Sequence, residues 1–326
     1  MAAEIGETPA VIARLLEREG ATLRTLGAKL RAIDPAVIVT CARGSSDHAA
    51  GYFKYLTEIF AGVPVASLGP SVASIYRAKL RLRHTVVIAV SQSGASPDLV
   101  ALQAAARDGG AFAIAAVNQL DSPLAAGADA VIPLHAGPER SVAATKSCIA
   151  AAVALAGLLA EWRGDVALGH AVSGLPAALD RALAGTWEEA LAALRSARSA
   201  YTIGRGPALP IAAEAALKLK ETCVLHAEAF SGAEVMHGPL ELVERGFPVI
   251  AFCQQDASAA ATQHSLARVR GFGGAVFEAS SAPTGHAALD PLAMLLSFYA
   301  FAEQLARDRG HDPDHPSHLR KVTLTV

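Results

Sequence analysis

The stretch His84–Asp98 (HTVVIAVSQSGASPD) constrains the fold of this chain more than any other. Its first part, Thr85–Val90, is a short apolar run rich in β-branched residues, which is typical of a buried parallel strand. The next six residues, Ser91–Ser96, are mostly small, polar or glycine, and Pro97 then begins a helical pattern with Ser96 as a suitable N-cap. Hydroxyls and free backbone N–H groups therefore converge at a helix N-terminus, which favours binding of an anion such as phosphate.

Apolar runs of the same kind alternate with helical patterns through the first half of the chain. A helical pattern over Thr8–Arg31 predicts one or two N-terminal helices, and further helices are expected at Asp47–Phe60 and Ala143–Trp162. The remaining expected strands of this half are Ala36–Cys41, Val63–Leu68, Ala111–Val117 and Ala130–Leu134. This alternation predicts a parallel sheet with helices on both faces.

The second half repeats the beginning of the first. Cys41–Ser45 aligns with Ile203–Pro207, because each segment follows an apolar strand and precedes a helix. The two glycines that match are 162 residues apart (206 − 44), close to half of the 326-residue chain, so we predict an internal duplication. Phe247–Cys253 and Gly274–Ala279 are expected as further strands of the second copy.

These patterns predict an α/β protein with two domains. The expected boundaries are N-terminal helices over residues 1–30, a first α/β domain over 31–168, an Ala-rich helical linker over 169–198, a second α/β domain over 199–310, and a polar C-terminal tail over 311–326.

Composition excludes several classes of function. Hydrophobic residues make up 52% and charged residues 18%, which is typical of a globular protein, and the net charge of −2 leaves no basic surface for nucleic acid. We expect no signal peptide and no membrane-spanning segment, because the N-terminus is acidic and no apolar run is long enough. The four cysteines are far apart and lack metal spacing, which favours buried thiols, no metal site and a reducing, cytoplasmic compartment.

Several motifs carry a resemblance to a known family. They are SQSG at Ser91–Gly94, AGPE at Ala136–Glu139 followed by Thr145-Lys146, EAALKLKE at Glu214–Glu221, HAEAF at His226–Phe230 and HGP at His237–Pro239. With these motifs the chain resembles tandem SIS (sugar isomerase) domain proteins, and in particular the isomerase half of glucosamine-6-phosphate synthase. The resemblance implies two SIS domains, each a flavodoxin-like three-layer αβα fold, and it covers the chain from about Ala36 onward.

The chain departs from the synthase pattern at two places, and these departures make another branch of the family the better match. The synthase begins with a glutaminase domain whose catalytic cysteine lies near its start, whereas residue 2 here is Ala and the sugar-binding part begins almost at once. The synthase also has a serine in its VAST stretch, where this chain has Val142-Ala143-Ala144-Thr145. The pattern therefore resembles more closely the stand-alone SIS-type glucosamine-6-phosphate deaminases.

The resemblance assigns binding of the sugar phosphate to two loops and to backbone groups of the VAST-like stretch. The residues concerned are Ser45, Ser46, Ser91, Gln92, Ser93, Ser96, Val142 and Ala144. Hydroxyls, an amide and a helix N-terminus bind a dianion without an arginine clamp. Arg43 and Arg205 occupy equivalent loops and are expected to be solvated surface charges, whereas Glu139 and Thr145 are expected to shape the pocket.

Aldose–ketose interconversion needs a base that moves a proton between C1 and C2, and a carboxylate suits this task. Glu221 matches the family's base, although alone a Glu at the end of a Lys-rich helix is usually an exposed salt-bridge partner. Lys218 lies three residues earlier on the same helix face, where it can hold that carboxylate or a substrate hydroxyl. Lys220 projects elsewhere and is expected to be solvated.

By resemblance, His237 is the residue that opens the sugar ring, and it reaches the site from the neighbouring subunit. This implies a homodimer with shared active sites. Lys321 matches a lysine on the tail that folds over the sugar, where it polarises the open-chain carbonyl or forms a transient imine with it. His48, His226 and His311 are expected to be structural or surface residues. No metal cluster and no dinucleotide fingerprint is present in the sequence, so no cofactor is expected.

The leading hypothesis is an enzyme that converts glucosamine 6-phosphate, or a related amino-sugar 6-phosphate, to fructose 6-phosphate and ammonia. The alternatives within the same family are an ammonia-dependent synthase, a phosphosugar isomerase without amine loss, and a deglycase acting on fructosyl-amine phosphates. A non-catalytic sugar-phosphate sensor is the alternative from another class, and it has no need of Glu221, His237 and Lys321.

Overall fold

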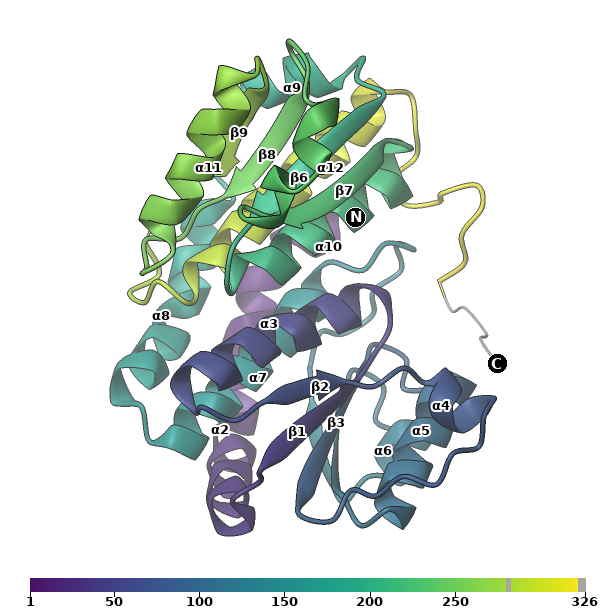
Figure 1. Ribbon diagram of the computed structural model, residues 1–326. Coiled ribbons are helices and arrows are strands. Elements are labelled where there is room, and N and C mark those ends of the chain that lie inside the picture. The colour runs from purple at the N-terminus through teal and green to yellow at the C-terminus, as the bar shows by residue number, and fades with distance from the viewer. Residues whose placement is uncertain (280–282, 322–326) are drawn as a thin grey trace. The chain divides into compact units, whose positions relative to one another are not determined.

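The computed structural model describes residues 1–279 and 283–321, and it divides into two compact units. The first unit consists of residues 10–139 and 146–173, and the second of residues 1–9, 140–145 and 174–321. Each unit contains one parallel sheet covered by helices (Figure 1). Two α/β units of this kind confirm the predicted fold class, while the predicted domain boundaries stay a prediction.

The sheet of the first unit has five strands in the order β2-β1-β3-β4-β5, and every neighbouring pair is parallel. Its strands are β1 (Val37–Cys41), β2 (Val65–Ser67), β3 (Thr85–Ser91), β4 (Phe112–Val117) and β5 (Ala130–Pro133). All residues of β3 are buried, as expected for a central strand with helices on both faces.

Alternating side chains of β3 pack on opposite faces of this sheet. Ala89 belongs to an apolar cluster with Leu99 and Leu102 of the helix after β3, and Val87 belongs to one with Ala106 of the same helix. Val86, Ile88 and Val90 point to the opposite face by strand alternation, where α3 and α7 pack on the sheet and on each other. The helices of this unit are α2 (Thr8–Ile33), α3 (Gly44–Phe60), α4 (Ser71–Ser74), α5 (Pro97–Asp108), α6 (Pro123–Ala126) and α7 (Lys146–Arg163).

The sheet of the second unit has four parallel strands in the order β7-β6-β8-β9. They are β6 (Ser199–Gly204), β7 (His226–Ser231), β8 (Pro248–Phe252) and β9 (Ala275–Ala279). This order repeats the order of the first four strands in the other unit. Gly44 and Gly206, the glycines matched in the sequence, have φ angles of +54° and +56°, so the strand-to-helix turn is also the same. These findings support the predicted duplication.

Among the described strands, β7 is the one that the sequence did not predict. It follows helix α10 after only two residues, because Val224 ends the helix in the left-handed conformation with φ +48°. It is an edge strand, and its sequence HAEAFS alternates exposed and buried residues without a strong apolar run. Edge strands with polar alternation lack the hydrophobic signal that reveals a central strand.

Helices cover both faces of the second sheet as well. Tyr201 and Val249 pack against Leu266 and Val269 of α11 on one face, whereas the Phe252 ring on the other face lies 5.7 Å from the ring of Phe298 in α12. The remaining helices along the chain are α1 (Ala2–Gly6), α8 (Val166–Ala182), α9 (Glu188–Leu194), α10 (Ala208–Cys223), α11 (Ala259–Gly271) and α12 (Asp290–Asp308), with 3-10 turns η1 (Glu234–Met236) and η2 (Pro239–Leu242). Within the described residues, no helix has the length and apolar character needed to cross a membrane.

Candidate active site

The predicted phosphate loops meet at the topological switch point of the first sheet. Strands β1 and β3 are neighbours, and the chain leaves them toward opposite edges of the sheet. Ligands of open α/β sheets bind in the crevice at the carboxyl ends of such a strand pair. Ser45 and Ser46 follow β1, and the segment 92–96 follows β3, so the fold brings these two groups to one crevice.

The loop after β3 is held in shape by its own serines. The backbone N–H of Gly94 donates to Ser91 Oγ at 3.0 Å, and the N–H of Ala95 donates to Ser93 Oγ at 3.3 Å. Gly94 has φ +63°, and a Cβ there would lie 2.2 Å from Ser122 Oγ. A glycine is therefore required for both the backbone conformation and the close approach of Ser122.

Two helices begin at this crevice. Helix α5 begins at Pro97 with Ser96 at the N-cap, as predicted, but the Ser96 side chain makes no capping hydrogen bond. Helix α3 begins at Gly44, so Ser45 and Ser46 lie in its first turn, and the predicted loop position of these serines was wrong. The positive φ of Gly44 turns the chain at once, which starts the helix three residues earlier than expected. Both N-termini present positive partial charge to a bound anion.

Arg43 is exposed at the surface, as expected, but it is also paired with a buried carboxylate. Its guanidinium donates from Nε and Nη2 to Asp98 Oδ2 at 3.1 and 2.8 Å, and the Asp98 side chain is fully buried. The other oxygen of Asp98 accepts the N–H of Leu99 in the first turn of α5. This ion pair ties the loop after β1 to the loop after β3. No local pattern predicts this pair, because the two residues are 55 positions apart.

Glu139 and Lys146 fix the start of helix α7. Glu139 accepts the backbone N–H of Ser147 at 3.1 Å and its hydroxyl at 2.6 Å, and Lys146 Nζ donates to the Pro138 carbonyl at 2.7 Å. The Glu139 carboxylate thus caps a helix N-terminus, a structural contribution. The four cysteines are buried free thiols, as predicted, and burial raises the pKa of Cys41 to about 12, which keeps that thiol protonated.

Glu221 lies in the last turn of α10 in the second unit. Lys218 Nζ donates to Glu221 Oε2 and also lies 3.4 Å from Glu214 Oε1, which accepts the Tyr299 hydroxyl at 2.9 Å. The Lys218 and Glu214 side chains are fully buried, whereas that of Glu221 is 21% exposed. One buried ammonium therefore holds two carboxylates, and only Glu221 of these three charged groups reaches the surface of a cavity.

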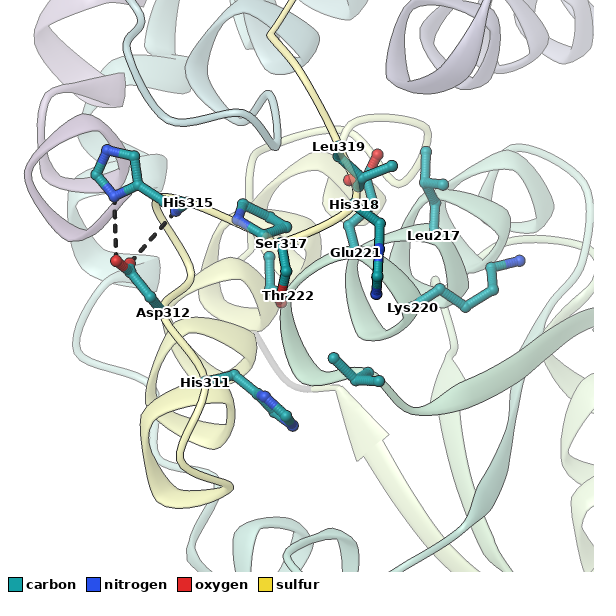
Figure 2. Close-up of a pocket in the computed structure, with 12 residues that line it drawn as sticks. Leu217, Lys220, Glu221, Thr222, His311, Asp312, His315, Ser317, His318 and Leu319 are labelled. Carbon is teal, nitrogen blue, oxygen red and sulfur yellow. Dashed lines mark hydrogen bonds and ion pairs between the residues drawn. The ribbon is translucent and has the colours of Figure 1, made fainter.

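That cavity has a volume of about 370 Å³ and opens between the end of α10 and the C-terminal strap, residues 311–321 (Figure 2). Figure 2 shows His318 and Leu319 of the strap beside Glu221. The lining residues are Leu217, Lys220, Glu221, Thr222, Val224, His311, Asp312, His315, Pro316, Ser317, His318 and Leu319. The structure thus brings Glu221 and the predicted tail together, and it leaves Lys220 exposed, as predicted.

The strap is fastened to the segment 140–145 of the same unit. Ser141 Oγ donates to Asp314 Oδ1 at 2.6 Å, the N–H of Val142 donates to the Asp314 carbonyl at 3.2 Å, and Lys321 Nζ donates to the Ser141 carbonyl at 2.7 Å. The N-terminal amine of Met1 pairs with Asp314. Hydrogen bonds from this amine and from Ser141 hold the pKa of Asp314 below its usual value. The N–H of Val142 is thereby occupied, and Ala144 is half-buried on the same segment.

His237 lies apart from this cavity. It follows η1, it is exposed, and it does not belong to the residues that line the pocket around Glu221. Gly238, with φ +117°, then turns the chain into η2. Within the second unit alone, the structure therefore does not bring His237 to Glu221.

Sequence reasoning missed several residues of this region. Glu214 and Tyr299 were not singled out, because their contact joins helices α10 and α12 across 85 positions. His315 and His318 were not considered, and His311 was expected to be structural or on the surface. A cluster of three histidines in eight residues is a visible signal in the sequence, but only the fold shows that all three line one cavity with Glu221.

A model of the SIS domain matches residues 33–160 and 193–278, one segment for each sheet. The chain belongs to the SIS domain family.

Three proteins that are similar to this chain carry the names of phosphosugar enzymes. The chain is 36% identical over 92% of its length to a glutamine--fructose-6-phosphate aminotransferase (isomerizing) of Symbiobacterium thermophilum, but it spans only 53% of that relative, about half its length. A crystal structure from Silicibacter pomeroyi DSS-3, provisionally named a phosphosugar isomerase, is 45% identical with a TM-score of 0.92 and covers 96% of this chain and 98% of its own. The C-terminal domain of glucosamine-fructose-6-phosphate aminotransferase from Francisella tularensis is 25% identical with a TM-score of 0.84, covering 95% and 96%.

Proposed function

We propose that the protein is a phosphosugar isomerase that deaminates its substrate, converting glucosamine 6-phosphate or a related amino-sugar 6-phosphate to fructose 6-phosphate and ammonia. The observation that carries this proposal is the Glu221 carboxylate, which reaches a cavity while the buried Lys218 ammonium holds it in place. A carboxylate that is held in place by a buried ammonium and also faces a cavity suits proton transfer on a bound sugar.

In this proposal the serine loop binds the phosphate. Ser45, Ser46, Gln92, Ser93 and Ser96 offer hydroxyls and an amide beside two helix N-termini, a set that stabilises a dianion. Ser91 keeps the loop in shape through the Gly94 N–H. Val142 and Ala144 are proposed to contact the sugar, Val142 by its side chain or carbonyl, since its N–H is already bonded.

The proposed chemistry begins with the open-chain aldehyde. Glu221 takes the proton from C2, which gives an enolamine, and returns a proton to C1, which leaves an imine at C2. Water adds to that imine, the C2–N bond breaks, and fructose 6-phosphate and ammonia are released. One water is consumed. The isomerisation reduces C1 from an aldehyde to an alcohol and oxidises C2 from an amine to an imine, so no external oxidant or reductant is needed. Free ammonia at low concentration draws the reaction toward deamination.

Two further residues have proposed roles from the family resemblance. Lys321 polarises the open-chain carbonyl or forms a transient imine with it, after it leaves its contact with the Ser141 carbonyl. His237 opens the sugar ring from a neighbouring subunit, which requires a homodimer with shared sites. The exposure of His237 on a short turn is compatible with such a contact.

An ammonia-release assay with glucosamine 6-phosphate, galactosamine 6-phosphate and N-acetylglucosamine 6-phosphate tests the proposal. The first or second sugar should release ammonia and form a ketose phosphate in equal amounts. Glu221→Gln keeps the shape of the side chain but removes the base, so turnover should drop by about two to four orders of magnitude. Lys220→Gln, on the exposed face of the same helix, is the matched control for loss of a nearby charge.

Three outcomes would contradict the proposal. Failure of every amino sugar to release ammonia would exclude deamination, and conversion of a neutral aldose 6-phosphate instead would identify a phosphosugar isomerase without amine loss. Undiminished exchange of the C2 proton with deuterated solvent in Glu221→Gln would show that another residue is the base.

A further inference from the structure

The deamination proposed above needs one more proton carrier than isomerisation does. When water adds to the C2 imine, one water proton must leave the oxygen, and the nitrogen must gain protons before the C2–N bond breaks. Glu221 is committed to the proton that moves between C2 and C1. A second group in the same cavity must therefore accept a proton and give it back near neutral pH, and imidazole is the side chain best suited to both.

The cavity around Glu221 contains three imidazoles, and their surroundings differ. His315 Nδ1 lies 3.1 Å from Asp312 Oδ2, and its side chain is 81% exposed. His311 follows the end of α12 and bonds through its backbone N–H to the Ala306 carbonyl. All three line the cavity with Glu221, and Figure 2 draws His311 and His315 farther from Glu221 than His318.

The other charged groups near Glu221 are poorly suited to this shuttle. Lys218 is fully buried and bonded to Glu221 and Glu214, so it does not line the cavity. Lys220 lines it, but a lysine ammonium is only a hydrogen-bond donor and has no lone pair that could accept a proton from water. Asp312 accepts backbone N–H bonds from Asp314 and His315, and the first of these holds the pKa of Asp312 below its usual value.

We propose that His318 is a catalytic residue of the deaminating step, which carries protons from the attacking water to the departing amine. Neutral His318 accepts a proton from water as the oxygen bonds to C2, and the imidazolium then donates it to the nitrogen. The hydroxyl proton of the carbinolamine takes the same route as the C2–N bond breaks and the C2 carbonyl forms. The imine N–H and the two water protons give NH₃, and His318 ends neutral, so the step is balanced without a further reactant.

This inference rests on the proposed deaminase function, and a partition experiment separates the two. The full-length protein is incubated with its amino-sugar 6-phosphate in deuterated water, and two rates are followed: ammonia release and entry of deuterium at C2 of the recovered substrate. In His318→Gln, ammonia release should fall by about two to four orders of magnitude, the usual range for loss of an acid–base group. Deuterium entry should stay within about threefold of wild type, because Glu221 still acts.

His264→Gln, which changes an exposed imidazole on α11 that does not line this cavity, is the matched control, and both of its rates should stay within about threefold of wild type. His318→Ala adds a second test, since external imidazole that enters the vacated space should restore part of the ammonia release, whereas it should leave Glu221→Gln unchanged. Equal loss of both rates in His318→Gln, or unchanged ammonia release, would overturn the role of His318 while the deaminase function stands. A wild-type protein that exchanges C2 but releases no ammonia would overturn both.

Discussion

The two sheets have the same strand order at their switch points, yet the loops there differ in charge. In the first unit the loop after β3 contains serines and glutamine, and its own acidic residue, Asp98, is neutralised by Arg43. In the second unit the loop after β8 contains Asp256, whose Oδ1 accepts the N–H of Ser258 at 2.8 Å and its hydroxyl at 2.6 Å. Gln254 is buried there and donates to the Arg205 carbonyl at 2.9 Å.

We therefore expect the loops after β1 and β3 to bind an outside anion, whereas the loop after β8 already contains the Asp256 carboxylate. A carboxylate beside the N-terminus of α11 supplies the negative charge that a phosphate would bring. The second unit offers its chemistry at a different place, the end of α10, where Glu221 faces the strap. The two copies of the fold thus share their strand order, while their loops differ in charge and in hydrogen bonding.

The largest expected contrast concerns anion affinity. Ser93→Ala combined with Gln92→Ala should weaken binding of inorganic phosphate by about 100-fold to 10,000-fold, because each of the two hydrogen bonds to a charged group contributes about 1.5–3 kcal/mol. Gln254→Ala in the equivalent loop should leave phosphate affinity unchanged. Isothermal titration calorimetry measures both dissociation constants. Equal losses in the two variants would show that the second crevice also binds the anion.

The next contrast compares the equivalent arginines. Arg43→Ala leaves the buried Asp98 carboxylate without its guanidinium, so unfolding should become easier by about 1–3 kcal/mol. Arg205→Ala removes a half-buried side chain from the matching loop and should cost less than about 0.5 kcal/mol. Chemical denaturation followed by circular dichroism compares them. Similar costs at both positions would mean that the Arg43–Asp98 pair adds no stability to the first loop.

The smallest expected effect is acid release of the strap in the second unit. Because the folded-state pKa of Asp314 is lowered, its contribution to stability is complete above the usual aspartate value and is lost as pH falls through the lowered value. Below about pH 4, the protection factors of the strap amides, corrected for the intrinsic pH dependence of hydrogen exchange, should therefore fall, while the serine loop of the first unit keeps its protection. Asp314→Asn should show low strap protection factors already at neutral pH. Strap protection factors independent of pH in the wild type would refute this role of Asp314.

The same pair of regions shows where sequence patterns stop being informative. Central strands such as β3 and β8 were predicted because both of their faces are apolar, whereas the edge strand β7 was missed because its polar alternation carries little signal. The start of α3 was placed three residues too late, since serines after a glycine suggest a loop as readily as a first helical turn. The motifs around Glu221 and Lys218 directed attention to the end of α10, where the structure contains a cavity.

The sequence by itself determined the parallel α/β class, the duplication, the serine loop after β3 and the short list of residues that includes Glu221. These features depend on local periodicity and on contacts within one helix or one strand-to-helix turn. Only the tertiary structure decided that Arg43 forms an ion pair with Asp98. The same holds for the hydrogen bond from Tyr299 to Glu214 beside Lys218, and for the cavity that His318 lines together with Glu221. Each of these contacts joins residues that are 55 or more positions apart, or that meet only because the strap folds back on α10. Local sequence patterns contain no information on which residues so far apart in the chain come into contact.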